Sequence, residues 1–205
     1  SLSAKKTNDV KEVLLNCEKL APHRGTSVKP LRMLIMGVPN VGKSTIINAL
    51  KNKKIAKVGN VPAVTKMQQR IEINSRMILT DTPGMMWPKI TNELDGIFLA
   101  ASHSIGINAY DEIETALILS DTLKERYPES LITYYGFKRP LPSDEEFLGH
   151  IAKARNFIMK GGKANLLKAA VTFINDYRNG VIGKVSLESP ATRSLMLKQS
   201  ELNTK

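Results

Sequence analysis

Cysteine, aromatic residues and long apolar runs are scarce in this sequence, and each shortage excludes a class of protein. The single cysteine, Cys17, leaves no internal disulfide and no cysteine-based metal site. No apolar run approaches the roughly 20 residues that a membrane-spanning helix needs, and no signal peptide is recognisable. At 205 residues and 42% hydrophobic content, the chain is long enough to bury a core as one large domain or two small ones. We therefore expect a soluble, cytoplasmic protein.

Acidic residues are also few, and the excess of positive charge is uneven. The formal net charge is +11, and residues 1–97 hold 16 Lys and Arg against 7 Asp and Glu. Residues 111–146 carry 4 basic and 9 acidic side chains, whereas residues 150–185 carry 7 basic and 1 acidic. This basic stretch is either a nucleic-acid-binding face or a solvated, lysine-rich surface. The three histidines, His23, His103 and His150, show no metal-ligand spacing.

A G-x-x-x-x-G-K-S motif runs from Gly37 to Ser44, after an apolar run that begins at Leu31. Apolar residues at helical spacing follow it, so the pattern predicts strand, phosphate-binding loop and helix. Glycines let the backbone N–H groups curl around phosphate oxygens, Lys43 reaches the β and γ phosphates, and the Ser44 hydroxyl holds Mg²⁺. The sequence thus predicts a nucleoside triphosphate site, whose loop residues are Pro39, Asn40, Val41, Gly42, Lys43, Ser44 and Thr45.

Asp81-Thr-Pro-Gly84 follows a second short apolar run and predicts the other side of the nucleotide site. Asp81 at the end of a buried strand would contact Mg²⁺, and the Gly84 backbone N–H would meet the γ-phosphate. Between the loop and this motif, residues 53–66 are polar and irregular, as in a nucleotide-sensing switch, with Thr65 completing the Mg²⁺ shell. We take Lys43, Thr65 and Gly84 as the catalytic candidates.

Met85 follows Gly84, where GTPases of the Ras kind place a glutamine that orients the attacking water. The thioether of methionine cannot orient a water molecule for attack. Hydrolysis in the isolated protein must therefore be slow, or be completed by another group.

The remaining pattern predicts a P-loop α/β domain followed by an α-helical one. We expect domains at 1–97 and 98–190, and a flexible tail at 191–205. Asp9 is the expected cap of the first helix. The expected helices are 9–21, 43–52, 94–101, 111–127, 131–137, 147–159 and 165–178, with a strand end at 1–5 and strands from Leu31, at 67–73 and at 77–80.

These motifs together resemble the circularly permuted GTPases that assemble the large ribosomal subunit, most closely the ribosome biogenesis GTPase A family. The resemblance rests on residues 37–44, on Val64-Thr65-Lys66, and on 81–89, where the apolar Met85 is a hallmark. It extends to the basic stretch 155–163 and to the ending 178–188.

In that family the guanine-reading Asn-Lys-x-Asp motif precedes the phosphate loop, and a later Ser-Ala-like loop touches guanine. Ser3 and Ala4 match the later loop, while Asn-Lys-x-Asp is missing. We therefore expect the sequence to be a fragment that begins just after that motif. Specificity for guanine can then not be inferred from any residue of this sequence. A family histidine implicated in hydrolysis is missing too, and Ala63 replaces the usual glycine before the switch threonine.

The resemblance also gives Asn40 two interpretations. In similar GTPases an asparagine here coordinates K⁺ beside the phosphates and replaces an arginine finger. Alternatively, Asn40 only favours a left-handed turn.

The resemblance implies a monomeric GTP/GDP switch, with Mg²⁺ and K⁺, that binds precursor large ribosomal subunits and is stimulated by them. RNA would contact Lys153, Arg155, Lys160, Lys163, Lys168 and Lys184. Two alternatives remain. One is another P-loop NTPase, such as a tRNA-modifying or metal-handling GTPase or an ATPase; the other is a non-enzymatic RNA-binding fragment.

Overall fold

The computed structural model describes residues 4, 6–51, 67–87, 89–106 and 109–195. The chain divides into two compact units, residues 1–88 and 89–205, each with its own apolar core. The border expected at 97/98 lies inside a helix, α3 (Glu93–Ala101), which belongs to the second unit. None of the described helices is long and apolar enough to cross a membrane.

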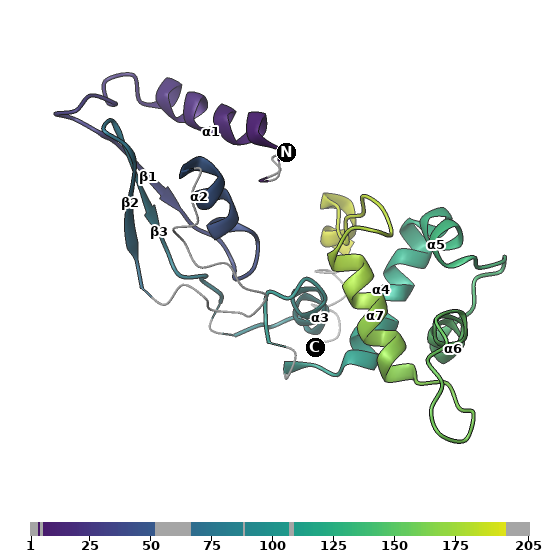
Figure 1. The fold of residues 1–205 in the computed structure, drawn as a ribbon. Coiled ribbons are helices and arrows are strands. Elements are labelled where there is room, and N and C mark those ends of the chain that lie inside the picture. The colour runs from purple at the N-terminus through teal and green to yellow at the C-terminus, as the bar shows by residue number, and fades with distance from the viewer. Residues whose placement is uncertain (1–3, 5, 52–66, 88, 107–108, 196–205) are drawn as a thin grey trace. The chain divides into compact units, whose positions relative to one another are not determined.

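The first unit is built on a three-stranded sheet with the order β1-β3-β2 (Figure 1). The strands are β1 (Leu31–Ile35), β2 (Gln69–Asn74) and β3 (Met77–Asp81). β1 and β3 are parallel, whereas β2 and β3 form the predicted antiparallel hairpin. The Asn74 side chain closes the turn by accepting a 2.8 Å hydrogen bond from the N–H of Arg76. This topology brings the ends of β1 and β3 to one edge of the sheet.

Helices α1 (Thr7–Leu20) and α2 (Lys43–Lys51) cover one face of this sheet. The alternating pattern of β2 turns Ile71 and Ile73 into the core that the sheet shares with these helices, as strand periodicity requires. Ile47 of α2 is fully buried in the same core. A core of this kind fixes α2, and with it the loop at its N-terminus.

The N-terminus of α1 differs from the expectation. Lys6 is the N-cap residue and makes no side-chain capping bond, and Asp9 lies inside the first turn. The predicted cap at Asp9 was therefore wrong. A carboxylate in the first turn still favours the helix through its interaction with the helix dipole.

The second unit is helical, as predicted, and its core is rich in aromatic rings. Phe147 stacks on Phe137 with ring centroids 4.7 Å apart, and it forms a T-shaped contact with Phe173 with ring centroids 5.1 Å apart. The buried Tyr135 donates a 2.9 Å hydrogen bond to Asp176, and burial raises the pKa of this phenol. Besides α3, the helices of this unit include α4 (Glu112–Arg126), α5 (Pro128–Tyr135), α6 (Asp144–Ala154) and α7 (Leu166–Arg178), and residues 190–195 form a further helical turn.

Helix α6 ends earlier than the apolar pattern predicted. The expected helix 147–159 stops at Ala154, and Asn156 takes a left-handed conformation with φ 56° that ends it. The chain then turns back, with an isolated antiparallel bridge between Ile158 and Ala164. The α6–α7 loop, residues 155–165, therefore projects from the unit as a narrow hairpin (Figure 1).

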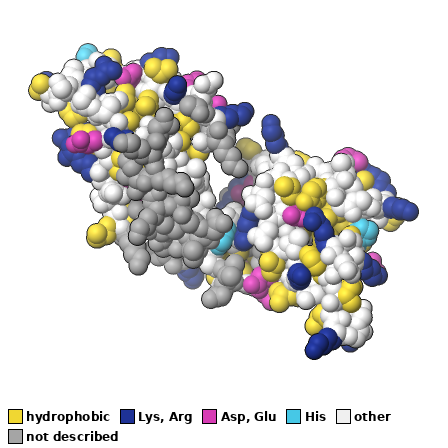
Figure 2. All heavy atoms as spheres, in the orientation of Figure 1, with side chains coloured by type: hydrophobic (Ala, Val, Ile, Leu, Met, Phe, Trp, Pro, Cys, Tyr) yellow, Lys and Arg dark blue, Asp and Glu magenta, His cyan; other side chains and the backbone are white. Residues whose placement is uncertain are grey.

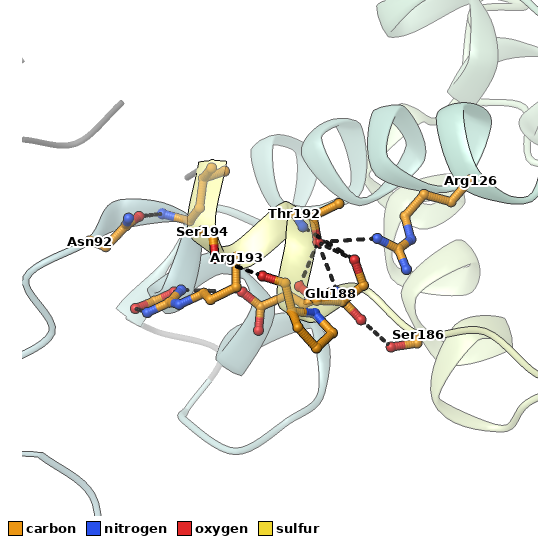
Figure 3. Close-up of polar contacts among 11 residues, drawn as sticks. Asn92, Arg126, Ser186, Glu188, Thr192, Arg193 and Ser194 are labelled. Carbon is orange, nitrogen blue, oxygen red and sulfur yellow. Dashed lines mark hydrogen bonds and ion pairs between the residues drawn. The ribbon is translucent and has the colours of Figure 1, made fainter. Parts of the chain in front are cut away.

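Two arginines from the C-terminal part of the chain hold α3 at its two ends. Arg178 donates to the carbonyl oxygens of Ala100 and Ala101, at 2.7 and 2.8 Å, where the helix leaves acceptors open. Arg193 forms a two-pronged ion pair with Asp95 in the first turn and also contacts Glu188 (Figure 3). Because these groups are separated widely in sequence, the contacts tie the C-terminal turn to α3.

Replacing Arg193 by methionine should lower the free energy of unfolding by about 1 kcal/mol, because a partly exposed, bidentate pair contributes modestly. Urea unfolding followed by circular dichroism measures the change. The control is Arg139→Met, which breaks a pair with Glu129 in which both side chains are mostly exposed. We expect that control to show no measurable loss; equal losses would contradict a specific role for Arg193.

Candidate nucleotide site

The loop between β1 and α2 has the backbone that a phosphate loop needs. Gly42, just before α2, has a φ of +94°, which side chains disfavour. Asn40 also takes a left-handed conformation, with φ 59°, and is exposed. The loop therefore curls back over the start of α2, whose N–H groups and dipole favour an anion there. Pro39 and Val41 lie in this curl, and Ser44 and Thr45 lie in the first turn of α2.

Lys43 is buried at the start of α2 and bonds to its own loop. Its ammonium donates to the carbonyl oxygens of Gly37 at 3.0 Å and Val38 at 2.8 Å. Burial lowers the pKa of Lys43, and the nearby Asp81 carboxylate acts in the opposite direction. A positive charge is thus held within the curl of the loop. The motif had predicted the position of Lys43, but nothing in the sequence indicated these carbonyl partners.

Asp81 ends β3, almost fully buried, directly beside the end of β1. The parallel register pairs Asp81 with Ile35, so the carboxylate and the loop meet at one sheet edge. Thr82 strengthens this junction by donating a 2.7 Å hydrogen bond to the Ile35 carbonyl. A buried carboxylate and the Ser44 hydroxyl are oxygen donors of the kind that Mg²⁺ takes alongside nucleotide phosphates. Among the described residues no cluster of three or more His, Cys, Asp or Glu side chains offers another metal site.

Gly84 lies against the phosphate loop. A Cβ atom at this position would stand 2.8 Å from the Cα and N atoms of Pro39, closer than packed atoms allow. The N–H of the next residue, Met85, donates a 3.2 Å hydrogen bond to the Gly37 carbonyl. The Asp-x-x-Gly segment and the phosphate loop are therefore in direct contact. The sequence predicted that both serve the γ-phosphate, but not that they touch through Pro39.

The structure brings most of the predicted site residues into one region. The loop residues, Lys43, Ser44, Asp81 and Gly84 all lie around the ends of β1 and β3. Ser3, Thr65 and the switch segment 53–66 lie outside the described residues, so their predicted roles stay predictions. Ala4 is half-buried, and its role in contacting guanine also stays a prediction.

The curled loop, the buried lysine and the adjoining Asp-x-x-Gly segment define a P-loop nucleotide-binding protein. A family model described as "50S ribosome-binding GTPase" matches residues 32–134. The ribosome biogenesis GTPase A of Bacillus licheniformis is 38% identical over 175 residues, which cover 84% of this chain and 62% of that protein. Its counterpart in Bacillus cereus is 34% identical over 198 residues, covering 93% and 67%.

Solved structures are also similar to this chain. The crystal structure of GNP-bound YlqF from T. maritima matches with a TM-score of 0.54 and 27% identity, covering 87% of this chain and 65% of that one. This chain belongs to the ribosome biogenesis GTPase A family. It spans about two thirds of the length of these relatives.

Proposed function

We propose that this chain is part of a GTP-hydrolysing switch protein that acts in assembly of the large ribosomal subunit, in the cytoplasm and as a monomer. The observation that carries the proposal is the contact of Gly84 and Met85 with the phosphate loop. A segment that touches the loop in this way can detect whether a γ-phosphate is present. The names of the relatives supply the ribosomal context.

In this proposal the loop amides and Lys43 hold the phosphates of GTP or GDP. Ser44 and Asp81, with Thr65 from the switch, would hold Mg²⁺, which neutralises phosphate charge when bound. Ser3 and Ala4 would lie against guanine. The Gly84 N–H would meet the γ-phosphate, so loss of that phosphate would release the segment from its bound position.

The proposal requires help for hydrolysis from outside the described site. Met85 follows Gly84, and its exposed thioether cannot orient water. Two sources of help are proposed: a K⁺ ion beside Asn40, and the precursor ribosomal particle. Both would act by stabilising charge that develops on the transferring phosphoryl group.

The K⁺ proposal predicts that GTP turnover in KCl exceeds turnover in NaCl. The left-handed backbone of Asn40 supports the alternative interpretation, since asparagine tolerates this conformation well. Asn40→Gly separates the two, because glycine adopts the same φ without strain and lacks the amide oxygen. We expect this variant to lose the difference between the salts, as measured by phosphate release at equal ionic strength.

Asn40→Ala is the companion variant. It removes the amide and also strains the turn, so it should lose both the K⁺ effect and some nucleotide affinity. A K⁺ advantage that survives in Asn40→Gly would mean that the residue serves the turn alone.

RNA would be bound by the basic stretch 150–185. Lys160 and Lys163 are exposed in the α6–α7 loop, and Lys168 lies 4.5 Å over the ring of Phe157 at its base. Arg155 is partly engaged with Asp176 at 3.4 Å. On the face drawn in Figure 2, lysine and arginine side chains lie scattered over the margin and the middle of the second unit. Such scattered cations suit phosphate contacts better than base reading.

Binding to ribosomal RNA should therefore weaken steeply as salt rises. Replacing both Lys160 and Lys163 by alanine should reduce the slope of log affinity against log salt by roughly 2, since each phosphate that a lysine neutralises adds about 0.9 to that slope. Fluorescence anisotropy across a salt series measures the slope. The control is the double variant of Lys138 and Arg139, which are exposed outside this stretch. Equal slopes in all three proteins would assign RNA binding to another surface.

The direct test of the whole proposal is nucleotide binding and turnover in K⁺ buffer, with GTP and with ATP, with and without large ribosomal subunits. We expect a preference for GTP and stimulation by the subunits. A preference for ATP would favour another class of P-loop NTPase. Subunit binding without nucleotide binding would favour a non-enzymatic RNA-binding fragment.

A further inference from the structure

A pocket of about 650 Å³ lies within the second unit, and its described lining residues all belong to that unit. It is lined by the end of α3 at Ser102, by the tyrosines that follow α4 and end α7, and by the turn after α7 up to Ser186. That turn belongs to the motif 178–188, to which the proposed function assigns only a phosphate contact at Lys184. The volume falls within the range of small-molecule sites, roughly 300–1,000 Å³.

The charge of the pocket favours an anion. Arg178 and Lys184 both line it, and none of the described residues that line it is acidic. The described partners of the Arg178 guanidinium are the neutral oxygens of Ala100, Ala101 and Asn175, so its positive charge is not cancelled by them. Lys184 is exposed. A phosphate entering the pocket would meet two cations.

The walls also provide aromatic surface. Tyr127 directly follows α4 and Tyr177 lies in the last turn of α7, and both line the pocket. The Tyr127 hydroxyl is held in place because it accepts a 3.0 Å hydrogen bond from the N–H of Ser186. Phosphate alone needs no aromatic wall, whereas a nucleobase stacks on tyrosine regardless of its identity. Aromatic surface beside cations favours a ligand that joins a base to a phosphate.

We propose that this pocket binds one nucleotide, with its base among the tyrosines and its phosphate near Arg178 and Lys184. The nucleotide could come from an unstacked position in RNA or from a free nucleoside monophosphate, and the shared chemistry is a base joined to a phosphate. The RNA source rests on the proposed function; the pocket itself does not. Because the base is recognised by stacking, single-stranded RNA should bind better than the same chain without bases.

The test measures binding of the full chain to a short fluorescent oligouridylate and to an abasic chain of equal length. We expect the base-bearing strand to bind about tenfold more tightly. Ser102→Leu places a bulky aliphatic side chain, with no ring on which a base could stack, at the exposed Ser102 on the pocket wall, and Lys184→Ala removes a cation without adding bulk. Ser102→Leu should abolish the difference between the two strands. Lys184→Ala should weaken base-bearing RNA and UMP together.

The matched control is Lys163→Ala, an exposed lysine outside the pocket. It should weaken both strands equally, since it meets phosphate alone. In a second arm, calorimetry with UMP shows whether the free nucleotide also binds and whether Ser102→Leu prevents it. UMP binding without a preference for base-bearing RNA would assign the pocket to free nucleotide. Equal affinity for both strands together with no heat from UMP would overturn the inference. That result would not bear on GTP turnover or on salt-dependent RNA binding. The proposed function is therefore tested independently of this inference.

Discussion

Replacing Lys43 by alanine should reduce GTP turnover by between about 100-fold and 1,000-fold, the usual cost of removing a group that stabilises charge in the transition state. The ammonium already lies in the curl of the loop, bonded to the Gly37 and Val38 carbonyls. Its buried position beside Asp81 means that no water-exposed cation can replace it easily. Phosphate release under saturating GTP measures the loss, and nucleotide affinity should fall as well.

Lys51→Ala is the matched control for this variant. Lys51 ends the same helix, and its ammonium also donates to backbone carbonyls, those of Glu72 and Ile73. Its removal should cost comparable stability while turnover remains within about twofold of the original. If Lys51→Ala lost as much turnover as Lys43→Ala, loop stability rather than charge at the phosphates would explain both results.

Gly84→Ala should lower turnover by about 100-fold, the size of effect expected when a catalytic segment is displaced by roughly 1 Å. The added methyl group would meet the backbone of Pro39 at 2.8 Å, so the segment or the loop must move. Affinity for GDP should change little, because GDP lacks the phosphate that Gly84 is proposed to meet. Turnover rates and GDP titrations on the same preparation test both expectations.

The control substitution is Gly149→Ala, at a glycine of α6 with no atom within 4 Å of the added methyl group. Alanine in a helix interior should raise stability slightly and leave turnover unchanged. An undiminished rate in Gly84→Ala would show that the contact with Pro39 is not part of the switch. A parallel loss of GDP affinity would show that the loop, not the sensor, had been deformed.

Features set by local chemistry could be predicted from the sequence. The G-x-x-x-x-G-K-S motif, the strand ending at Asp81 and the helix beginning after Asn165 depend on neighbouring residues. The expected helix 165–178 included Asn165, which the structure shows as the cap of α7, where it accepts a hydrogen bond from the N–H of Lys168.

Features set by how segments of the chain fold back on one another could not be predicted. The apolar run Phe157-Ile158-Met159 continued the helical pattern of α6, but the left-handed Asn156 ends that helix and Ile158 pairs instead with Ala164. The contact of Gly84 with Pro39 likewise depends on how two loops approach one another. No spacing rule encodes it, although the two motifs had indicated that both loops serve one ligand.

The double attachment of α3 has a mechanical consequence. Its first turn is held through Asp95 and its last carbonyls through Arg178, so neither end is free to fray. The chain that leaves Gly84 enters this helix at Asn92, which caps it by accepting from the N–H of Leu94. A pull on the chain at Asn92 would therefore have to break these side-chain contacts before it could unwind either end of α3.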